Sequence, residues 1–379
     1  MITQPNPLPL DYKPRPPSHL KVDRIVLSKG STATTERQRY IDRLCSAYPE
    51  AEVIEALDTQ HNRIDLGITD AQERQRRGKR TLVIGVHASA VRFSQEEGNA
   101  CPNYWHFSPV GYCFYQCRYC YLAGTRSFWF APSVKVFVNL EEILDKIDRQ
   151  AKKLGEPTAF YVGKLQDGLA LDPLTGFSKV LVPFFAAHEH ARQVILTKSA
   201  DVQNLLGLDH GDKTILSWSL NPPEVANEFE ANVPSVEDRL TAMAKCAEAG
   251  YPVRAVLMPV IPVRGWKEIY TRFVADLLAR VPIQRLTIGG ICSYANAVNL
   301  MEQALGSNNA ISRNMDPGRK MGDGRRRYPR DLRVEMYRHI LDCARGVDAD
   351  VELALCLEER EVWDALCLAD RIGRCNCVL

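Results

Sequence analysis

The sequence has little net charge and no apolar run long enough to span a membrane. Its 379 residues include 48 Lys and Arg against 46 Asp and Glu, so any nucleic-acid-binding role has to rest on local patches. The first residues, Met-Ile-Thr-Gln-Pro-Asn-Pro-Leu-Pro, have no apolar core, and a secretory signal peptide is not expected. These absences predict a cytoplasmic protein with no membrane partner.

Cysteine, in contrast, is abundant, with 12 residues. In a reducing compartment such thiols are more typical of metal sites than of disulfides. Three of them, Cys113, Cys117 and Cys120, have the spacing C-x3-C-x2-C and lie among aromatic residues. A structural zinc site normally has four protein ligands. Three thiolates instead suit a [4Fe-4S] cluster with one open iron, because such clusters usually take four cysteines. A zinc knuckle that borrows a distant ligand, and three incidental buried cysteines, are the alternatives.

Strands and helices alternate after this loop, which predicts an α/β fold. We expect a partial (βα)6-type parallel barrel, with active-site groups at the C-terminal ends of its strands. The expected units are an extended arm (1–20), an N-terminal α/β unit of βαβ type (21–100), the barrel (101–293) and a C-terminal region (294–379). Expected strands are 22–29, 51–57, 81–88, 158–162, 194–197, 214–219, 253–260, 285–288 and 350–355. Expected helices are 34–48, 140–154, 177–191, 201–206, 236–249, 266–280 and 332–345, with a long loop or hairpin region at 294–330.

The cysteine spacing, with Tyr119 directly before the third cysteine, resembles the signature of radical S-adenosylmethionine (SAM) enzymes. Further stretches resemble the spore photoproduct lyase family, whose members split a UV-made thymine dimer in DNA. These stretches are Ser217-Trp218-Ser219-Leu220-Asn221-Pro222, Phe229-Glu230, Glu248-Ala249-Gly250-Tyr251-Pro252-Val253, Met258-Pro259 and Gly265-Trp266. The resemblance covers nearly the whole chain.

The resemblance implies a carbon–carbon lyase that uses a [4Fe-4S] cluster to cleave SAM to a 5'-deoxyadenosyl radical. Cys113, Cys117 and Cys120 would hold the cluster. Asp167, Lys198 and Ser217 would contact SAM, and Tyr119 and Tyr121 would relay a hydrogen atom. From the residues alone, Asp167 also fits a turn, and the two tyrosines also fit a shield around the cluster. Damaged DNA and an electron donor such as flavodoxin or ferredoxin are the implied partners.

One position departs from the family pattern. Where the lyases place a hydrogen-donor cysteine, this chain has Lys164, whose ammonium group cannot donate a hydrogen atom to a carbon radical. We expect Cys375 or Cys377, on a mobile and exposed tail, to reach the barrel mouth and replace it. Alternatively, Lys164 marks a changed reaction, with its charge near SAM or a substrate phosphate. A third hypothesis is that the tail joins Cys356 or Cys367 in binding a second metal or cluster. The alternative for Cys356 and Cys367 is that they are buried structural thiols.

A basic run from Arg319 to Arg333 favours a nucleic-acid substrate, with arginines along phosphates and Tyr328 stacked on a base. Another basic stretch, at residues 74–80, is more simply a solvated loop. If the basic surface is scattered, the sequence favours a radical SAM enzyme that modifies a peptide or small molecule. A non-catalytic metal-binding module is the hypothesis from another class.

Overall fold

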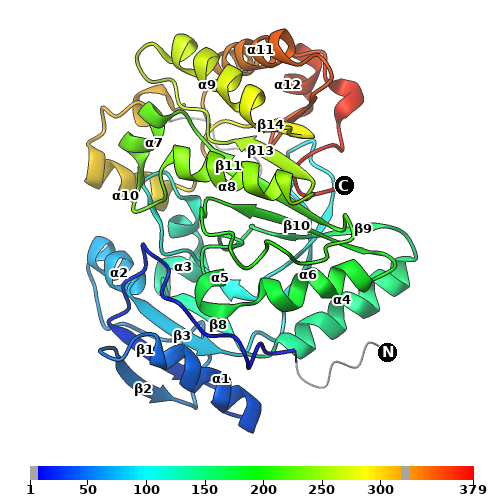
Figure 1. The fold of residues 1–379 in the computed structure, drawn as a ribbon. Helices are drawn as coiled ribbons and strands as arrows, with labels where there is room; N and C mark the ends of the chain where they lie inside the picture. Colours follow the sequence, from blue (N-terminus) through cyan, green and yellow to red (C-terminus); the bar gives the residue numbers. More distant parts are fainter. Residues whose placement is uncertain (1–6, 317–323) are drawn as a thin grey trace.

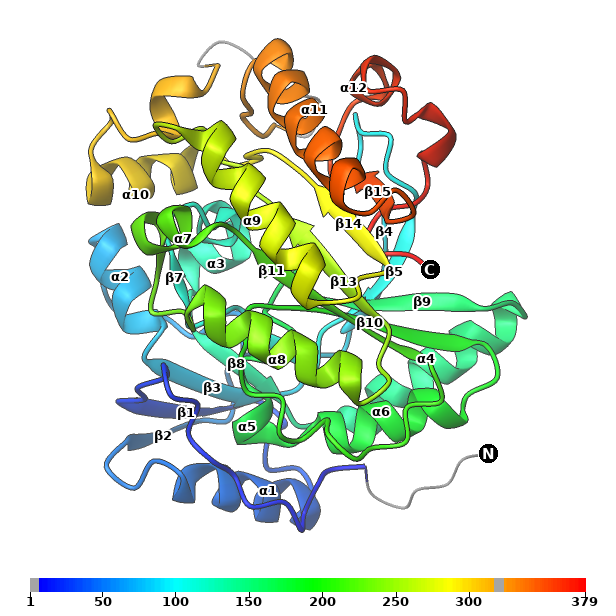
Figure 2. The same cartoon turned by 45° about the horizontal axis from the view of Figure 1, so that its top comes forward.

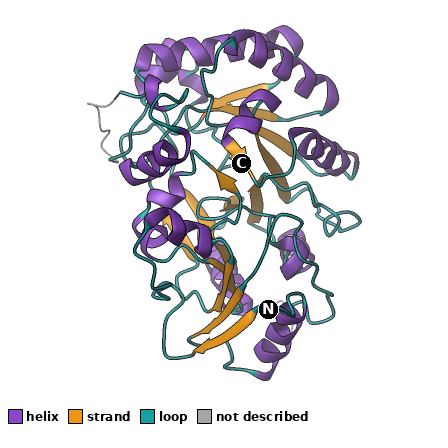
Figure 3. Ribbon diagram, turned by 90° about the vertical axis from the view of Figure 1, so that its left-hand side faces the viewer, coloured by secondary structure: helices purple, strands orange, loops and turns teal. Residues whose placement is uncertain are grey.

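The structure is a computed structural model that describes residues 7–316 and 324–379. Its strands form a five-stranded sheet, an eight-stranded sheet and a two-stranded ribbon. Figure 1 shows the smaller sheet in the blue N-terminal part of the molecule, below the larger sheet. Helices cover the outer faces, and the strands run through the middle (Figure 3). Among the described residues, no helix is both long and apolar enough to cross a membrane.

The N-terminal sheet has the order β2-β1-β3-β8-β6, and it is parallel except for its last pair. It confirms the expected βαβ unit. The side chain of Thr34 caps α1, and that of Asp70 caps α2, so Arg74, Arg76 and Arg77 lie on a helix rather than in the expected solvated loop. Because β8 and β6 come from beyond residue 100, the expected unit boundaries stay a prediction. The elements are β1 (Arg24–Ser28), α1 (Thr35–Ser46), β2 (Glu52–Ala56), α2 (Ala71–Gly78), β3 (Thr81–Gly85), β6 (Val110–Gly111) and β8 (Val134–Phe137).

The larger sheet has the order β15-β14-β13-β11-β10-β9-β5-β4, in which only the last pair is antiparallel. Within the described residues β15 and β4 are its two edges, so the predicted partial barrel is confirmed. The strands are β4 (Val91–Ser94), β5 (Tyr104–Phe107), β9 (Thr158–Val162), β10 (Ala191–Thr197), β11 (Thr214–Leu220), β13 (Val253–Leu257), β14 (Arg285–Ile288) and β15 (Glu352–Leu355).

Helices follow these strands on the convex side, as Figure 2 shows for α8, α9 and α11. In α4 the apolar side chains recur every three or four residues and are buried, and Gly155, in the left-handed conformation, ends the helix. The helices are α3 (Arg126–Phe130), α4 (Leu140–Leu154), α5 (Asp172–Thr175), α6 (Ser178–Ala187), α7 (Pro223–Phe229), α8 (Val236–Glu248), α9 (Trp266–Arg280), α10 (Ala295–Leu305), α11 (Arg330–Val347) and α12 (Arg360–Ala365).

Successive side chains of a strand point to opposite faces of the sheet, so alternate residues of the barrel strands face the core and the site. On β11, Leu216, Trp218 and Leu220 belong to the main core beneath the helices. Ser217 and Ser219 alternate with them and therefore lie on the concave face. The concave face of β11 therefore carries its two serines toward the site.

Two further expected elements are wrong. Residues 201–206 form turns rather than a helix, because the Asp201 side chain accepts a hydrogen bond from the backbone N–H of Gln203 and competes with helical bonding. The expected loop after residue 294 contains α10, whose buried face includes Val298 and Met301.

The C-terminal tail, residues 375–379, is docked on the concave face rather than mobile and exposed. Arg285 donates to the carbonyl of Cys375 at 2.9 Å, and Arg254 donates to that of Val378 at 2.6 Å. Cys375 is 2% exposed. Figure 2 shows this red segment ending near β13 and β5.

Candidate active site

The three-cysteine loop lies between the two sheets. It leaves the N-terminal sheet at β6 and returns to it at β8. Between them β7 (Gln116–Cys117) pairs antiparallel with β12 (Glu230–Ala231), which follows α7 of the barrel. Tyr112 opens the loop with a φ of 62°, uncommon for a side chain of this size, and its ring stacks on Phe128. The loop is therefore fixed from both sheets.

Cys113, Cys117 and Cys120 all line one cavity of about 660 Å³ at the C-terminal ends of the barrel strands. Burial raises the pKa of Cys117 to about 12, and Lys198 opposes this shift. Burial likewise raises the pKa of Cys113, and Lys79 opposes it. Buried thiols with lysines at hand suit thiolate ligands of a positive metal centre.

The geometry of these thiols fits a cluster better than a single ion. Within the described ranges, no three His, Cys, Asp or Glu side chains converge as one metal ion would require. A three-cysteine iron–sulfur cluster needs no such convergence, because each thiolate binds a different iron. The residues present therefore fit the predicted [4Fe-4S] cluster, and the assignment of the three ligands stays a prediction.

A buried ionic network adjoins the loop. Lys198, at the end of β10, donates to Ser219 Oγ at 2.5 Å, and its Nζ lies 3.3 Å from Glu230 Oε1. Glu230 also forms an ion pair of 2.7 Å with Arg239, and it accepts a hydrogen bond from the hydroxyl of Tyr119. Burial alone would raise the pKa of Glu230, but Lys198 and Arg239 outweigh it and lower that pKa to about 2. Glu230 thus stays ionised and holds Lys198 beside the cysteines.

Asp167 lines the cavity, but its carboxylate is already engaged by the protein. One oxygen accepts from Thr197 Oγ1 at 2.6 Å and from the N–H groups of Leu169 and Ala170. The other accepts from the N–H of Lys198 at 2.7 Å. Asp167 therefore joins the loop after β9 to the end of β10, and its predicted contact with SAM stays a prediction.

Ser217 is fully buried, and its hydroxyl donates to Asn376 Oδ1 of the tail at 2.8 Å. Two residues further along β11, Ser219 lines the cavity and meets Lys198. Of the two hydroxyls, that of Ser219 lies at the cavity wall. The contact predicted for Ser217 is not tested by this arrangement.

Lys164 also lines the cavity, and its ammonium group is taken up by neighbours. It donates to Ser94 Oγ and Glu96 Oε1, both at 2.7 Å. Glu96 forms a second ion pair, of 2.9 Å, with Arg325. Burial alone would raise the pKa of Glu96, but Lys164 and Arg325 lower it. Tyr121 donates to the carbonyl of Lys164, so its hydroxyl closes the same wall.

The expected phosphate-binding run is largely internal. Arg319 and Lys320 lie outside the described residues. Three arginines of the rest are buried: Arg325, 6% exposed, Arg327, 4%, and Arg333, 2%. Arg327 donates to Asn99, and Arg333 pairs with Glu358. Tyr328 is 2% exposed within the core, so the prediction that it stacks on a base is wrong.

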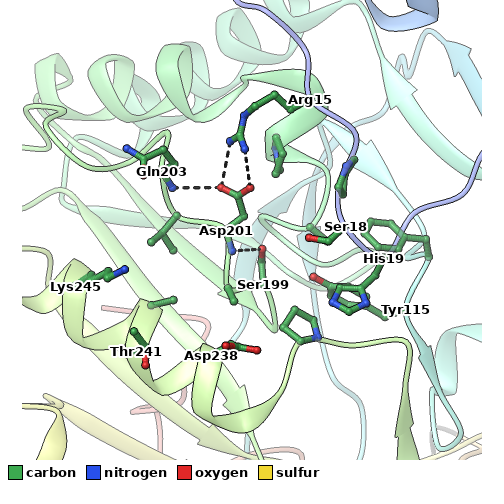
Figure 4. Close-up of a pocket in the computed structure, with 18 of the residues that line it drawn as sticks. Arg15, Ser18, His19, Tyr115, Ser199, Asp201, Gln203, Asp238, Thr241 and Lys245 are labelled. Carbon is green, nitrogen blue, oxygen red and sulfur yellow. Dashed lines mark hydrogen bonds and ion pairs between the residues drawn. The ribbon is translucent and has the colours of Figure 1, made fainter. Parts of the chain in front are cut away.

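A second pocket, of about 490 Å³, lies beneath the N-terminal arm and shares Tyr115 with the cysteine cavity. Figure 4 shows Arg15 of the arm in a paired contact with Asp201, at 3.2 and 3.3 Å. Ser199 supports Asp201 from below. The arm is therefore held against the barrel.

Sequence reasoning missed Glu230, Arg239 and Ser219. Glu230 lies in the Phe229-Glu230 pair that carries the family resemblance, but its partners are distant in sequence. Ser219 could have been found from its spacing. Residues two apart on a strand lie on the same face, so Ser219 points into the barrel with Ser217.

A parallel partial barrel with a three-cysteine loop at the C-terminal ends of its strands defines the class of radical SAM proteins. The model of the family described as spore photoproduct lyase matches residues 38–288, more than half of the chain. This chain belongs to the spore photoproduct lyase family.

Individual relatives agree. The spore photoproduct lyase of Bacillus subtilis (strain 168) is 31% identical over 226 residues, which cover 59% of this chain and 64% of the relative. That of Geobacillus sp. (strain Y412MC61) is 31% identical over 223 residues, covering 58% and 63%. These matches span less than two thirds of either relative.

Solved structures support the fold. A spore photoproduct lyase complexed with dinucleoside spore photoproduct has a TM-score of 0.76 and 22% identity, covering 88% of this chain and 99% of that one. A variant of such a lyase, with bound AdoMet (SAM) and dinucleoside spore photoproduct, has a TM-score of 0.75 and 22% identity, covering 89% and 98%.

Proposed function

We propose that this protein is a radical SAM lyase that repairs a UV-made thymine dimer, or a related lesion, in DNA. The observation that carries the proposal is one cavity that unites three thiols, Lys198 and Ser219 within the fold of the family. One solved relative holds bound SAM together with dinucleoside spore photoproduct. A cavity of about 660 Å³ is of the size that small-molecule ligands occupy.

In this proposal Cys113, Cys117 and Cys120 hold the cluster, which with bound SAM supplies one-electron chemistry and an adenosyl radical. Lys198 and Ser219, with Ser217 deeper in the barrel, form the cationic and hydroxyl side of the SAM site. Glu230 fixes the direction of the Lys198 ammonium group, which can then meet a carboxylate.

The tyrosines and the tail carry the hydrogen-transfer roles. Tyr119 has a buried carboxylate, Glu230, to receive its hydroxyl proton, which suits loss of an electron and a proton together. Tyr121 lies on the cavity wall beside Lys164. Cys375 and Cys377 line the same cavity, and either thiol could quench a substrate radical in place of the cysteine that Lys164 replaces.

The partners we propose are damaged DNA and a one-electron donor such as flavodoxin or ferredoxin. A reducing cytoplasm suits a chain with 12 cysteines.

The test is anaerobic reconstitution with iron and sulfide, followed by SAM, a reductant and UV-irradiated DNA. We expect 5'-deoxyadenosine and restored thymine from the native chain. Cys117→Ala should abolish 5'-deoxyadenosine, because a ligand of the cluster is lost, whereas Cys45→Ala in α1 should leave it unchanged. Near-normal SAM cleavage by the Cys117 variant would contradict the ligand assignment.

The buried arginines favour a second candidate, a radical SAM enzyme acting on a peptide or small molecule. Arg325, Arg327 and Arg333 are paired inside the protein, so these three side chains offer no basic surface for DNA. SAM cleavage by the native enzyme with no repair of irradiated DNA would favour this candidate.

A further inference from the structure

The cysteine cavity collects thiols well beyond the three of the loop. Eight of the chain's 12 cysteines line it, although its wall is a small part of the chain. Three of the eight are the predicted cluster ligands. The other five are Cys101, Cys292, Cys356, Cys375 and Cys377. Thiols from separate segments of the chain thus gather at one place.

Four of these thiols come together from three segments. Cys101 lies in the loop before β5, Cys356 directly follows β15, and Cys375 and Cys377 lie in the tail. The N–H of Ala100 donates to the carbonyl of Glu358 at 2.7 Å, which ties the first two segments together. Arg285 donates a hydrogen bond to the carbonyl of Cys375 at 2.9 Å, which fixes the third segment, the tail, on the barrel.

The four thiols also lie close to one another. Cys375 and Cys377 share a hydrogen bond, and Cys377 is within electrostatic range of Cys356 and Cys101. Cys101 and Cys356 are within the same range of each other and of Cys375.

The surroundings favour an anionic centre. Arg254 and Arg285, 4% and 2% exposed, lie beneath the tail. Asn376, between the two tail cysteines, is 3% exposed, and its Nδ2 has no hydrogen-bond partner among the described residues. Amide donors and cations near thiolate sulfur are what iron–sulfur clusters commonly have around them.

We propose that Cys101, Cys356, Cys375 and Cys377 bind a second iron–sulfur cluster in the same cavity. Four thiolates are the usual ligand number for such clusters. A mononuclear zinc site is disfavoured, because in the described part of the chain no three suitable side chains converge on one ion. Because cysteines occupy all of its ligand positions, this cluster has no open iron to bind SAM. It is therefore suited to electron transfer.

The proposal does not depend on lyase activity, but it competes with hydrogen donation by the tail. A thiolate bound to iron carries no S–H, so Cys375 and Cys377 cannot be both ligands and donors. The iron content of the protein separates the two roles.

The experiment measures iron and acid-labile sulfide per chain after anaerobic reconstitution of the full chain. The first-site variant replaces Cys113, Cys117 and Cys120 with Ala, and the second-site variant replaces Cys101 and Cys356 with Ser. We expect each to retain about half of the native iron and sulfide. The second-site variant should keep an electron paramagnetic resonance signal that changes on addition of SAM. Cys45→Ala and Cys367→Ala, outside the cavity, should keep the native content.

A folded first-site variant without iron and sulfide would overturn the proposal, as would one that holds zinc without sulfide. If that variant does not fold, the second-site variant decides. Half the native iron in it supports a second cluster, and an unchanged iron content refutes one.

Discussion

At the scale of single residues, Glu230 determines the charge balance beside the cysteine loop. Its carboxylate, with no exposed side-chain surface, faces both Lys198 and Arg239. Glu230→Gln would leave two buried cations without a counter-charge. We expect it to lower the free energy of unfolding at pH 7 by about 3–5 kcal/mol, as removal of one partner from a buried pair typically does. Urea denaturation would measure this loss.

The difference in stability between the native protein and Glu230→Gln should also depend on pH, and the lowered pKa of Glu230 gives the direction of that dependence. The pKa of Glu230 is about 2 in the folded protein and roughly 4.3 in an unfolded chain. A lowered pKa stabilises the folded state above the unfolded pKa, and this contribution is lost as the pH falls toward 2. The difference between native protein and Glu230→Gln should therefore be constant from pH 7 to about 5 and shrink below. A constant difference down to pH 3 would contradict the assignment. Glu237→Gln, at an exposed pair with Arg280, should change stability little.

At the scale of elements, the tail docks on β11 through the hydrogen bond from Ser217 to Asn376. Asn376→Ala leaves the Ser217 hydroxyl buried without an acceptor, and we expect a cost of about 1–3 kcal/mol. In a double-mutant cycle with Ser217→Ala, the two effects should be clearly less than additive. Ser219→Ala is the matched control, since Ser219 bonds Lys198 instead, and its effect should add to that of Asn376→Ala. Additive effects in both cycles would show that the tail is held by other contacts.

What the sequence could predict follows from how local each signal is. The helices at 140–154 and 266–280 and the strands at 158–162 and 285–288 were located from periodicity alone. The cysteine spacing marked the loop because its ligands are near neighbours. The docking of Cys375 depends on Arg285, and the network of Glu230 depends on Tyr119 and Lys198. No local sequence pattern encodes such distant pairs. An arginine-rich segment is therefore predicted to be exposed, because the carboxylates that pair with its side chains are distant in the sequence.

At the scale of the whole molecule, a charge of +2 and internal arginines predict recognition through the cavity rather than through a basic surface. Binding of a short single-stranded lesion should then depend weakly on salt. Each phosphate contact would contribute only about 0.7 to the log–log slope. Arg325→Gln should lower the free energy of unfolding and leave this slope unchanged. Arg39→Gln, on the exposed face of α1, should also leave the slope unchanged. If the slope of the Arg325→Gln variant is shallower by the contribution of about one phosphate contact, Arg325 contacts a phosphate.

The pairing of β7 with β12 has a consequence for biosynthesis. Tyr119 and its partner Glu230 are 111 residues apart, so the cysteine loop leaves the ribosome long before the segment that fixes it. The tail that closes the concave face is made last of the described segments. Iron delivered to the nascent chain would therefore meet three thiols in an unfixed loop, open to oxygen and to competing metals. Insertion of a cluster is therefore expected to follow translation, once the barrel is nearly complete.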